Sequence, residues 1–437
     1  MEALDLQRTL ENVSVTSSAT PSDEESPRSW TFSDRGYYDL TPPTEVSYTE
    51  DIDDLNARPI DPEEEPLVAV IGVGYVGEHL VSVFSERYDV LGYDVSPARV
   101  ELLSETYSSN DRVKITCDTQ KIAAATHFLI SVPTLLLPDK TIDSSYLRSA
   151  LRAVELHARP GATVVIESSV AVGMTRELLG PLAKERGFFA GMSPERVDPG
   201  RSFPPHIPSP RLCLAWTTSS PVVPVSRPEV AEMMKLYENC QRMVCIAYAN
   251  EMADACVSHG IDPYEVCKAA ASKPFGYMPY MPGLGVGGHC IPVNPYYLLS
   301  NSKFPLLQAA SEKMHARPAE IARRAVDRLY SQPRDGVLPR VLVVGIGFKV
   351  GQSHLVNSPG LELAKSLVVS QKVQVAWADP LVKQDSVPMI SRLDEADWSV
   401  EKLERDFDMI IVAFRQHGLD FNVLENLKGV HVEMWCN

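Results

Sequence analysis

Residues 68–77 read Val68-Ala-Val-Ile-Gly72-Val-Gly74-Tyr75-Val76-Gly77, an apolar run followed at once by a G-x-G-x-x-G pattern. Where such a pattern joins a strand to a helix, its glycines permit a tight turn, close approach of the backbone to a pyrophosphate, and close packing of helix on strand. Asp94 ends the next apolar run, 22 residues after Gly72, where a carboxylate can bond a ribose hydroxyl. The stretch predicts a dinucleotide-binding unit, and the alternative is a purely structural turn.

Short apolar runs alternate with segments of helical period in two parts of the chain, which predicts parallel sheets with helices on both faces. The runs are Val68–Ile71, Val90–Tyr93, Phe128–Val132 and Thr163–Ile166 in the first part, and Val341–Gly345, Val373–Ala376 and Met409–Ala413 in the second. Between them, residues 228–259 carry an apolar stripe at helical spacing, formed by Met233, Tyr237, Val244, Ala247 and Tyr248. This pattern predicts a long central helix, and another helical stretch is expected around residues 318–330.

The predicted fold class is therefore α/β, with two Rossmann-like doubly wound domains joined by a long central helix. The expected limits are 1–65 for a disordered acidic tail, 66–227 for an NAD-binding domain, 228–336 for a central helical domain with a cysteine loop, and 337–437 for a C-terminal α/β domain. Residues 1–66 hold 17 Asp/Glu and 4 Arg, so the tail contributes −13 of the net charge of −16. Its apolar residues are too few to offset the entropic cost of ordering it; alternatively, residues 30–38 dock on a partner.

Composition limits the class of protein. A chain of 437 residues with 44% apolar residues can bury two or three cores. We expect no nucleic-acid partner because a basic stripe is missing, and no membrane span or secretory signal because no long apolar run occurs, so the expected location is cytoplasmic. Eight cysteines without a C-x-x-C pair or zinc-ligand spacing predict neither a disulfide framework nor a metal, and most of them are expected to be buried.

The expected cofactor is NAD, because a carboxylate at Asp94 would repel the 2′-phosphate of NADP. Thr134 and Ser169 follow two of the predicted strands at the carboxyl edge of the sheet, where ligands of this fold bind. The residues expected to bind the cofactor are Gly72, Gly74, Tyr75, Val76, Gly77, Asp94, Arg99, Thr134 and Ser169.

A second motif, Gly283-Leu-Gly-Val-Gly-Gly-His289-Cys290-Ile291, places one thiol in a glycine-dense loop. Such a setting favours a nucleophile over a thiol that merely packs, and no other cysteine in the chain shares it. Lys235 and Asn239 lie four residues apart on the central helix with Arg242 three further on, a spacing that by itself favours a solvated face. Glu195, in a proline-bounded loop, is either a surface acid or a carboxylate that faces the cofactor.

Three motifs together give a family resemblance over about residues 66–437. They are Ser193-Pro-Glu-Arg-Val-Asp-Pro-Gly200, Pro228-Glu-Val-Ala-Glu-Met-Met-Lys235-Leu-Tyr-Glu-Asn239, and Lys273-Pro-Phe-Gly-Tyr-Met-Pro279 leading into Gly287-Gly-His-Cys290-Ile-Pro-Val-Asn-Pro-Tyr-Tyr297. In this order they resemble the nucleotide-sugar dehydrogenases (the UDP-glucose/GDP-mannose dehydrogenase family), most closely the enzymes that oxidise UDP-N-acetylglucosamine or UDP-N-acetylmannosamine. The resemblance implies oxidation of the sugar C6 alcohol to a carboxylate with two NAD⁺.

The resemblance also implies roles for individual residues. Cys290 would carry a thiohemiacetal and then a thioester, Lys235 and Asn239 would stabilise the oxyanion, and Glu195 would assist the hydrolytic water. Thr134 and Ser169 match positions near the nicotinamide. A UDP-sugar would be the substrate, UDP would bind the C-terminal domain, and the central helix would form a homodimer. The substrate-binding residues implied are Lys273, Phe275, Gly276, Tyr277, Gly287 and Lys349.

Three departures from the family pattern leave other functions open. Asn294 stands where the family usually has aspartate, Val356 stands where arginine is common, and residues 201–227 are shorter than the corresponding segment of relatives. An amide can neither take up a proton nor carry the charge of a carboxylate. The alternatives to the full enzyme are a catalytically impaired protein that binds sugar nucleotide and NAD, and a one-step dehydrogenase that releases the aldehyde.

Overall fold

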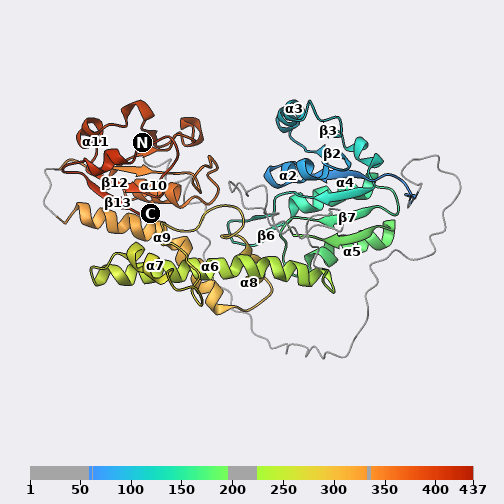
Figure 1. Ribbon diagram of the computed structural model, residues 1–437, viewed down its shortest axis with the longest axis horizontal. Coiled ribbons are helices and arrows are strands. Elements are labelled where there is room, and N and C mark those ends of the chain that lie inside the picture. The colour runs from blue at the N-terminus through green and yellow to red at the C-terminus, as the bar shows by residue number, and fades with distance from the viewer. Residues whose placement is uncertain (1–58, 62, 195–223, 332–335, 437) are drawn as a thin grey trace, which may run out of the picture. The chain divides into compact units, whose positions relative to one another are not determined.

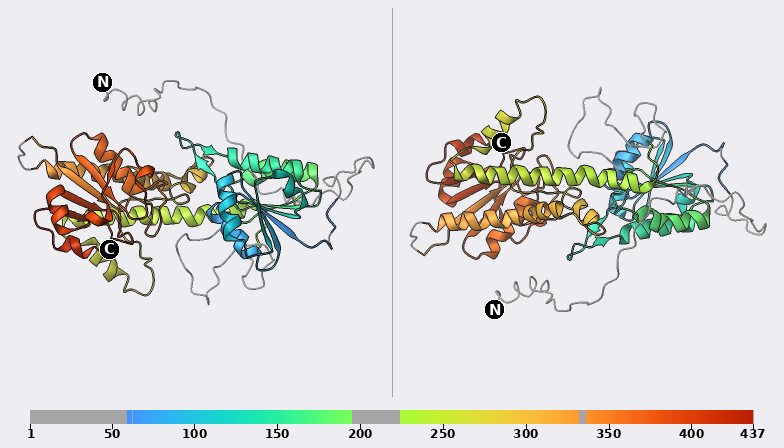
Figure 2. Two further views of the ribbon diagram at one scale, coloured as in Figure 1. Left: turned by 90° about the horizontal axis from the view of Figure 1, so that it is seen from above. Right: turned by 90° about the horizontal axis from the view of Figure 1, so that it is seen from below.

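The computed structural model describes residues 59–61, 63–194, 224–331 and 336–436 (Figures 1 and 2). Most of the predicted tail, Glu195 and most of the shortened segment lie outside the described residues. Within them, no helix combines the length and the apolar character needed to cross a bilayer.

The first sheet has six parallel strands in the order β3-β2-β1-β4-β7-β8 (Figure 1). Its strands are β1 (Leu67–Ile71), β2 (Asp89–Tyr93), β3 (Val113–Thr116), β4 (His127–Ile130), β7 (Thr163–Ile166) and β8 (Phe189–Met192). The connecting elements are α2 (Tyr75–Phe84), α3 (Pro97–Thr106), η2 (Thr119–Ala124), the hairpin β5–β6 (Leu135–Leu136 and Ile142–Asp143), α4 (Ser145–His157) and α5 (Met174–Arg186). The doubly wound prediction is confirmed.

Alternate residues of β1 pack on opposite faces of this sheet, as the period of a strand requires. Val68 and Val70 join the core under α2 and α3, whereas Ala69 and Ile71 join the core under η2, α4 and α5. Because both faces are covered, the strand reads as a continuous apolar run.

The second sheet has five parallel strands in the order β11-β10-β9-β12-β13. Its strands are β9 (Arg340–Val344), β10 (Gln374–Ala378), β11 (Ser391–Arg392), β12 (Met409–Val412) and β13 (His431–Met434). The associated helices are α10 (Pro359–Val369), η3 (Gln384–Ser386), η4 (Glu395–Asp397), α11 (Val400–Asp406) and α12 (Asn422–Glu425). One face packs on α9 and α10, and the other packs on α11 and α12.

Between the sheets in sequence are α6 (Pro228–Ser258), α7 (Pro263–Ala270), α8 (Asn294–Leu299) and α9 (Pro305–Leu329). Figure 2 shows α6 as one uninterrupted helix, and it packs against α7, α8 and α9. With 31 residues it is the predicted central helix.

On α6, Met233, Tyr237 and Tyr248 of the predicted stripe are exposed and Ala247 is buried, and the buried face carries Leu236 and Met243 as well as small and polar side chains. Other details were predicted wrongly or missed. Helix α9 begins at Pro305 rather than near Pro318, which lies buried inside it. The strands β3, β8, β11 and β13 were not predicted, since each is short and only partly buried.

The cysteine predictions also need correction. Only Cys240 is buried among the cysteines that the structure describes, and Cys117 is exposed as Cys290 is. Exposure is therefore not unique to Cys290. What distinguishes Cys290 from Cys117 is the glycine-dense loop around it.

Arg317 joins four segments of the chain. Its guanidinium is fully buried and donates two hydrogen bonds to Asp254 of α6, at 2.7 and 3.2 Å. It donates a third, at 3.0 Å, to the carbonyl oxygen of Gly283 at the start of the cysteine loop, and it lies 5.3 Å from the ring centroid of Trp435. Burial raises the pKa of Asp254, but the hydrogen bonds and charges of Arg317 and Arg324 outweigh it, so the pKa is lowered overall.

We expect Arg317→Met to destabilise the fold by about 3 kcal/mol, because it leaves Asp254 and the Gly283 carbonyl without their buried donor. Arg323→Met on the same helix is the matched control: the Arg323–Asp327 pair is 68% and 61% exposed, and its loss should cost no more than about 0.5 kcal/mol. Denaturant unfolding of both variants is the measurement. Equal midpoints for the two variants would contradict the role given to Arg317.

Candidate active site

The glycine loop after β1 has no space for a side chain at Gly72 and Gly77 but has space for one at Gly74. Gly72 has φ of +87°, and a Cβ there would lie 2.9 Å from the carbonyl oxygen of Ser131. A Cβ at Gly77 would lie 1.9 Å from the carbonyl oxygen of Gly72, whereas one at Gly74 would meet nothing within 4 Å. Gly72 and Gly77 thus close the turn, and Gly74 leaves its backbone open to a ligand at the N-terminus of α2, where the helix dipole favours an anion.

Asp94 and Arg99 both bond to this loop. The Asp94 carboxylate accepts hydrogen bonds from the amides of Val73, at 3.1 Å, and Ser96, at 2.9 Å. Arg99 donates to the carbonyl oxygen of Val73, at 2.8 Å, and pairs with Glu78, at 2.5 Å. Asp94 therefore stands beside the loop, at the place where a ribose would follow a bound pyrophosphate.

The remaining expected cofactor residues lie at the same end of the first sheet. Tyr75 is exposed at the start of α2, and the half-buried Val76 packs on the core beneath it. Thr134 donates a hydrogen bond to the carbonyl oxygen of Ser169, at 2.8 Å, just beyond the adjacent strands β4 and β7. Two segments 35 residues apart thus meet where the sequence placed the nicotinamide end of the site.

The cysteine loop leads directly into α8. The carbonyl oxygen of Cys290 accepts hydrogen bonds from the amides of Val293 and Asn294, at 3.2 and 2.8 Å, and the Cys290 side chain is exposed. His289 is exposed too, and partial desolvation together with the nearby His354 lowers its pKa. Its imidazole is therefore neutral at pH 7 and able to accept a proton.

Asn294 joins the cysteine loop to α6. It is 1% exposed, and its side-chain oxygen accepts a hydrogen bond from Asn239, itself 5% exposed, at 2.6 Å. Lys235, one turn earlier on α6, is 7% exposed. A solvated face is thus wrong for Lys235 and Asn239, because both side chains are buried. Arg242 is exposed and does not share the face.

The cysteine loop is also held by the segment after β9. The amide of Gly288 donates to the carbonyl oxygen of Val356, at 3.0 Å, and Asn357 donates back to the carbonyl oxygen of Gly288, at 2.9 Å. A Cβ at Gly287 would lie 2.9 Å from the Pro359 side chain. Val356 makes its contact with Gly288 through its carbonyl oxygen. The hydrogen bond to Gly288 therefore does not depend on whether valine or the family's arginine stands at position 356. Lys349 is half-buried in this segment.

The other expected substrate residues follow α7. Lys273, Phe275 and Gly276 are exposed, and the Lys273 ammonium lies 4.9 Å from the ring centroid of Phe275. Tyr277 is half-buried, and burial and the nearby Cys267 raise its pKa. They form an open surface that presents an aromatic ring and a cation.

Two tyrosines of α8 that the sequence analysis did not single out link the cysteine loop to the first sheet. Tyr296 accepts a hydrogen bond from Lys140 of the β5–β6 hairpin, at 2.8 Å, across 156 residues of sequence. Tyr297 is fully buried, packed in the core that the hairpin residues Leu136 and Ile142 also touch. Burial raises the pKa of Tyr297, the Thr134 hydroxyl lowers it, and Cys290 and Asp143 raise it further. In the sequence, the only signal for this contact between the cysteine loop and the first domain was the Pro-Tyr-Tyr run that follows Asn294.

Comparisons with known proteins agree with this geometry. The NAD-binding domain model of the UDP-glucose/GDP-mannose dehydrogenase family matches residues 102–240, and the central-domain model of that family matches residues 229–313. The chain is 31% identical over 386 residues to UDP-N-acetyl-D-mannosamine dehydrogenase of Pyrococcus horikoshii, covering 79% of this chain and 88% of the relative. The chain belongs to this dehydrogenase family.

Two further similarities support the assignment. The chain is 29% identical to UDP-N-acetyl-D-glucosamine 6-dehydrogenase of Pseudomonas aeruginosa, over 73% of this chain and 83% of the relative. The solved structure of the UDP-D-ManNAc dehydrogenase of Pyrococcus horikoshii superposes with a TM-score of 0.69 at 26% identity, covering 84% of this chain and 99% of that one. This member of the family is an oxidoreductase that uses NAD.

The two kinds of glycine should respond differently to alanine. Gly77→Ala must displace the Gly72 backbone, so we expect a loss of about 1–3 kcal/mol in stability together with loss of NAD⁺ binding. Gly74→Ala has room and an ordinary φ of −64°, so it should melt as the wild type does, yet bind NAD⁺ about tenfold more weakly because the methyl group occupies the open backbone. Calorimetry and thermal melts check both. Unchanged affinity in Gly74→Ala would move the pyrophosphate away from this loop.

Proposed function

We propose that this protein oxidises the C6 alcohol of a UDP-N-acetylhexosamine, UDP-N-acetylglucosamine or UDP-N-acetylmannosamine, to the uronic acid. The observation that carries the proposal is the buried Asn239–Asn294 hydrogen bond, which fixes a polar face of α6 beside the turn that starts at Cys290. The names of the relatives support the substrate class. A protein that only binds its ligands needs no exposed thiol in this position.

The first oxidation yields an aldehyde at C6. NAD⁺, when bound, accepts one hydride in each of the two oxidations. The Cys290 sulfur then adds to the aldehyde carbon: the carbon–sulfur bond forms as the carbonyl π bond opens, the oxygen gains negative charge, and the proton that leaves the sulfur ends on that oxygen. Lys235 and Asn239 are suited to stabilise that oxygen, because a cation and an amide donor act strongly where water is excluded.

The second oxidation converts the thiohemiacetal to a thioester. Water then adds to the thioester carbon, the carbon–sulfur bond breaks, and the products are the carboxylate and the Cys290 thiol. We assign the proton of that water to Glu195, as the family pattern implies. Asn294 provides no second base, because its side-chain oxygen already accepts from Asn239 and an amide does not take up a proton.

The other parts of the chain take supporting roles in this proposal. Gly72, Gly74, Gly77, Asp94, Thr134 and Ser169 bind NAD⁺, with Tyr75, Val76 and Arg99 shaping its loop. Lys273, Phe275, Gly276, Tyr277, Gly287 and Lys349 bind the UDP-sugar. A second copy of the chain covers the exposed apolar residues of α6, which include Met233, Tyr237, Tyr248 and Met252.

Counting NADH tests the reaction. We expect 2 NADH per sugar and a uronic acid from the wild type, and no uronic acid from Cys290→Ala, which retains NAD⁺ binding because the thiol is not part of the cofactor site. Cys117→Ala, the other exposed cysteine, is the matched control and should behave as the wild type. The measurement is mass spectrometry of the product with absorbance at 340 nm. A normal yield of acid from Cys290→Ala would overturn the covalent mechanism.

The NADH count also separates the alternative functions. One NADH per sugar with free aldehyde would identify the one-step dehydrogenase, an alternative that the amide at Asn294 leaves open. Binding of both ligands without NADH would identify a non-catalytic homologue.

Asn294→Asp should speed hydrolysis of the thioester. It places a carboxylate at a position that is 1% exposed and bonded to Asn239, near Lys235, and so adds a group that can orient or deprotonate water. We expect the covalent Cys290 adduct, trapped by acid quench and weighed by mass spectrometry, to be abundant in the wild type and at least about threefold less abundant in the variant. Asn301→Asp, at an exposed asparagine beyond α8, is the control. Equal adduct in all three proteins would show that Asn294 does not limit hydrolysis.

A further inference from the structure

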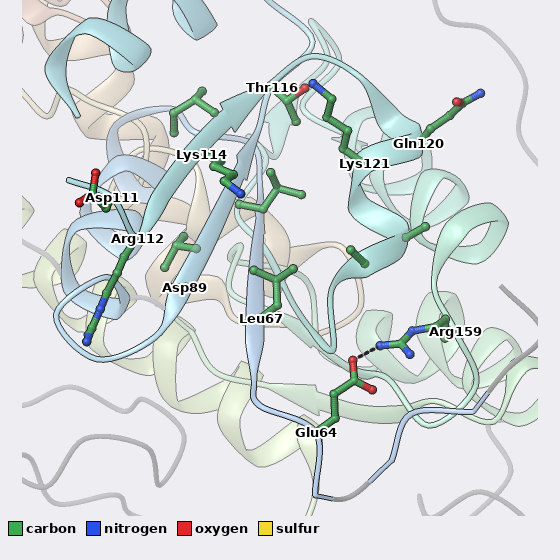
Figure 3. Close-up of a pocket in the computed structure, with 15 residues that line it drawn as sticks. Glu64, Leu67, Asp89, Asp111, Arg112, Lys114, Thr116, Gln120, Lys121 and Arg159 are labelled. Carbon is green, nitrogen blue, oxygen red and sulfur yellow. Dashed lines mark hydrogen bonds and ion pairs between the residues drawn. The ribbon is translucent and has the colours of Figure 1, made fainter. Parts of the chain in front are cut away.

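Both oxidations of the proposed reaction need the nicotinamide close to Cys290, yet NAD⁺ and the thiol are held by different parts of the chain. The carboxyl ends of the strands in the first sheet carry the glycine loop and Thr134. The opposite ends of β1 and β2 border a cavity of about 940 Å³, where Glu64 pairs with Arg159 (Figure 3). Contacts that fix the cofactor relative to the thiol are therefore expected at the end that carries Thr134.

The β5–β6 hairpin connects that end of the sheet to α8. It starts directly after Thr134, and Lys140 at its turn is six residues further on. Tyr296 of α8 is likewise six residues after Cys290. The Lys140 ammonium donates a hydrogen bond to the Tyr296 hydroxyl, at 2.8 Å, and lies 4.8 Å from the centroid of its ring. One contact thus joins the segment that follows the cofactor edge to the segment that follows the thiol.

Lys140 occupies a backbone position that glycine usually fills. Its amide donates to the carbonyl oxygen of Leu137, at 2.8 Å, and the amide of Leu137 donates to the carbonyl oxygen of Thr141, at 2.9 Å, so residues 138–140 form the loop of the hairpin. The φ of Lys140 is +66°, in the left-handed region. The last residue of such a three-residue loop is commonly glycine, because a side chain is strained there. The hairpin therefore keeps a lysine at a conformational cost, and its contact with Tyr296 offsets that cost.

The surroundings of Lys140 hold the hairpin against the helices of the central part of the chain. Lys140 and Tyr296 are both half-buried, and the adjacent Tyr297 is fully buried in a core that includes residues of the hairpin. Burial and the charge of Lys140 lower the pKa of His315, whereas Glu362 raises it, so the ammonium faces α9 as well as α8. Apolar packing has no preferred direction, whereas a hydrogen bond does. The bond from Lys140 therefore sets where the turn of the hairpin lies on α8.

We propose that Lys140 is a positioning residue for hydride transfer: its bond to Tyr296 holds the Thr134 edge of the cofactor site in place relative to Cys290. This role rests on the proposed function, since the placement matters only if a sugar is oxidised beside Cys290. Lys140 touches no reacting atom and acts through Tyr296 and the hairpin. A misplacement of about 1 Å can cost roughly a hundredfold in rate. Loss of the contact should therefore slow hydride transfer without weakening NAD⁺ binding.

Lys140→Gly separates positioning from stability. It removes the ammonium but relieves the left-handed strain, so we expect a melting temperature within about 3 °C of the wild type and an NAD⁺ Kd within about twofold. Hydride transfer should be at least about tenfold slower. The measurement is stopped-flow absorbance at 340 nm with UDP-N-acetylglucosamine and UDP-N-acetylmannosamine, each also deuterated at C6 so that the hydride step is identified by its isotope effect.

Two further variants bracket this result. Lys140→Arg keeps a cation that can donate to Tyr296, so it should restore hydride transfer to within about threefold of the wild-type rate. Gln371→Gly is the matched control, because Gln371 is exposed and also left-handed, with φ of +55°. This variant relieves the same kind of strain elsewhere and should transfer hydride as the wild type does.

Tyr296→Phe tests the other side of the contact. It should slow hydride transfer as Lys140→Gly does, and the double variant should lose no more than either single variant. We also expect the amides of residues 135–143 to exchange with solvent at least about threefold faster in Tyr296→Phe than in the wild type, a readout that needs no activity. Tyr330→Phe removes another tyrosine hydroxyl, bonded at 2.8 Å to the carbonyl oxygen of Lys372, and should leave that exchange unchanged.

The two measurements separate the role of Lys140 from the proposed function. If the wild type makes NADH and Lys140→Gly transfers hydride at the same rate, Lys140 is not a positioning residue, and the proposed function stands. If the wild type makes no NADH from either UDP-sugar, the proposed function fails and the role in hydride transfer fails with it. Faster exchange in Tyr296→Phe would in that case assign the contact a structural role alone.

Discussion

The buried guanidinium of Arg317 holds the functional half of this molecule together. A fully buried guanidinium is stable only where its N–H groups donate to acceptors. The acceptors here are the carboxylate of Asp254 on α6 and the carbonyl oxygen of Gly283. Those two partners are the central helix and the first residue of the cysteine loop. The position of Cys290 relative to Lys235 and Asn239 therefore depends on contacts of Arg317 with Asp254, 15 residues after Asn239, and with Gly283, seven residues before Cys290.

The cysteine loop is glycine-dense for two separate reasons. Gly287 and Gly288 pack against Pro359 and Phe348, where a Cβ would clash, and Gly288 needs φ of +92°. The loop is thus pinned by backbone contacts to the segment after β9, and the thiol at its end remains exposed. A nucleophile must be both accessible and fixed in position, and this arrangement provides both.

The buried face of α6 combines polar contacts with the apolar packing of Leu236, Cys240, Met243 and Ala247. Its core residues include Glu232, Lys235, Asn239 and Asn250, and Glu232 accepts hydrogen bonds from the amides of Gly173 and Thr175 at the start of α5. Hydrogen bonds of Glu232 therefore fix α6 to the start of α5, and the hydrogen bond of Asn239 fixes it to Asn294, just after the cysteine loop. Within the apolar stripe, Met233, Tyr237 and Tyr248 are exposed whereas Ala247 is buried, so periodicity identified the helix but not which of its residues are buried.

The sequence by itself determined the buried strands β1, β2, β4 and β7 of the first sheet and β9, β10 and β12 of the second, together with the glycine turn and the central helix, because continuous apolar runs and glycine spacing are local properties. It also singled out Cys290 and Asp94 as residue types suited to the chemistry, whereas the Lys235–Asn239 pair gained a role only from the family resemblance. The tertiary structure decided which of these are buried and what they touch: the Asn239–Asn294 bond, the Lys140–Tyr296 bridge and the Arg317–Asp254 pair each join residues more than fifty positions apart. No local pattern encodes such pairs, because the free energy of burying a polar group depends on a partner that only the folded chain brings within reach.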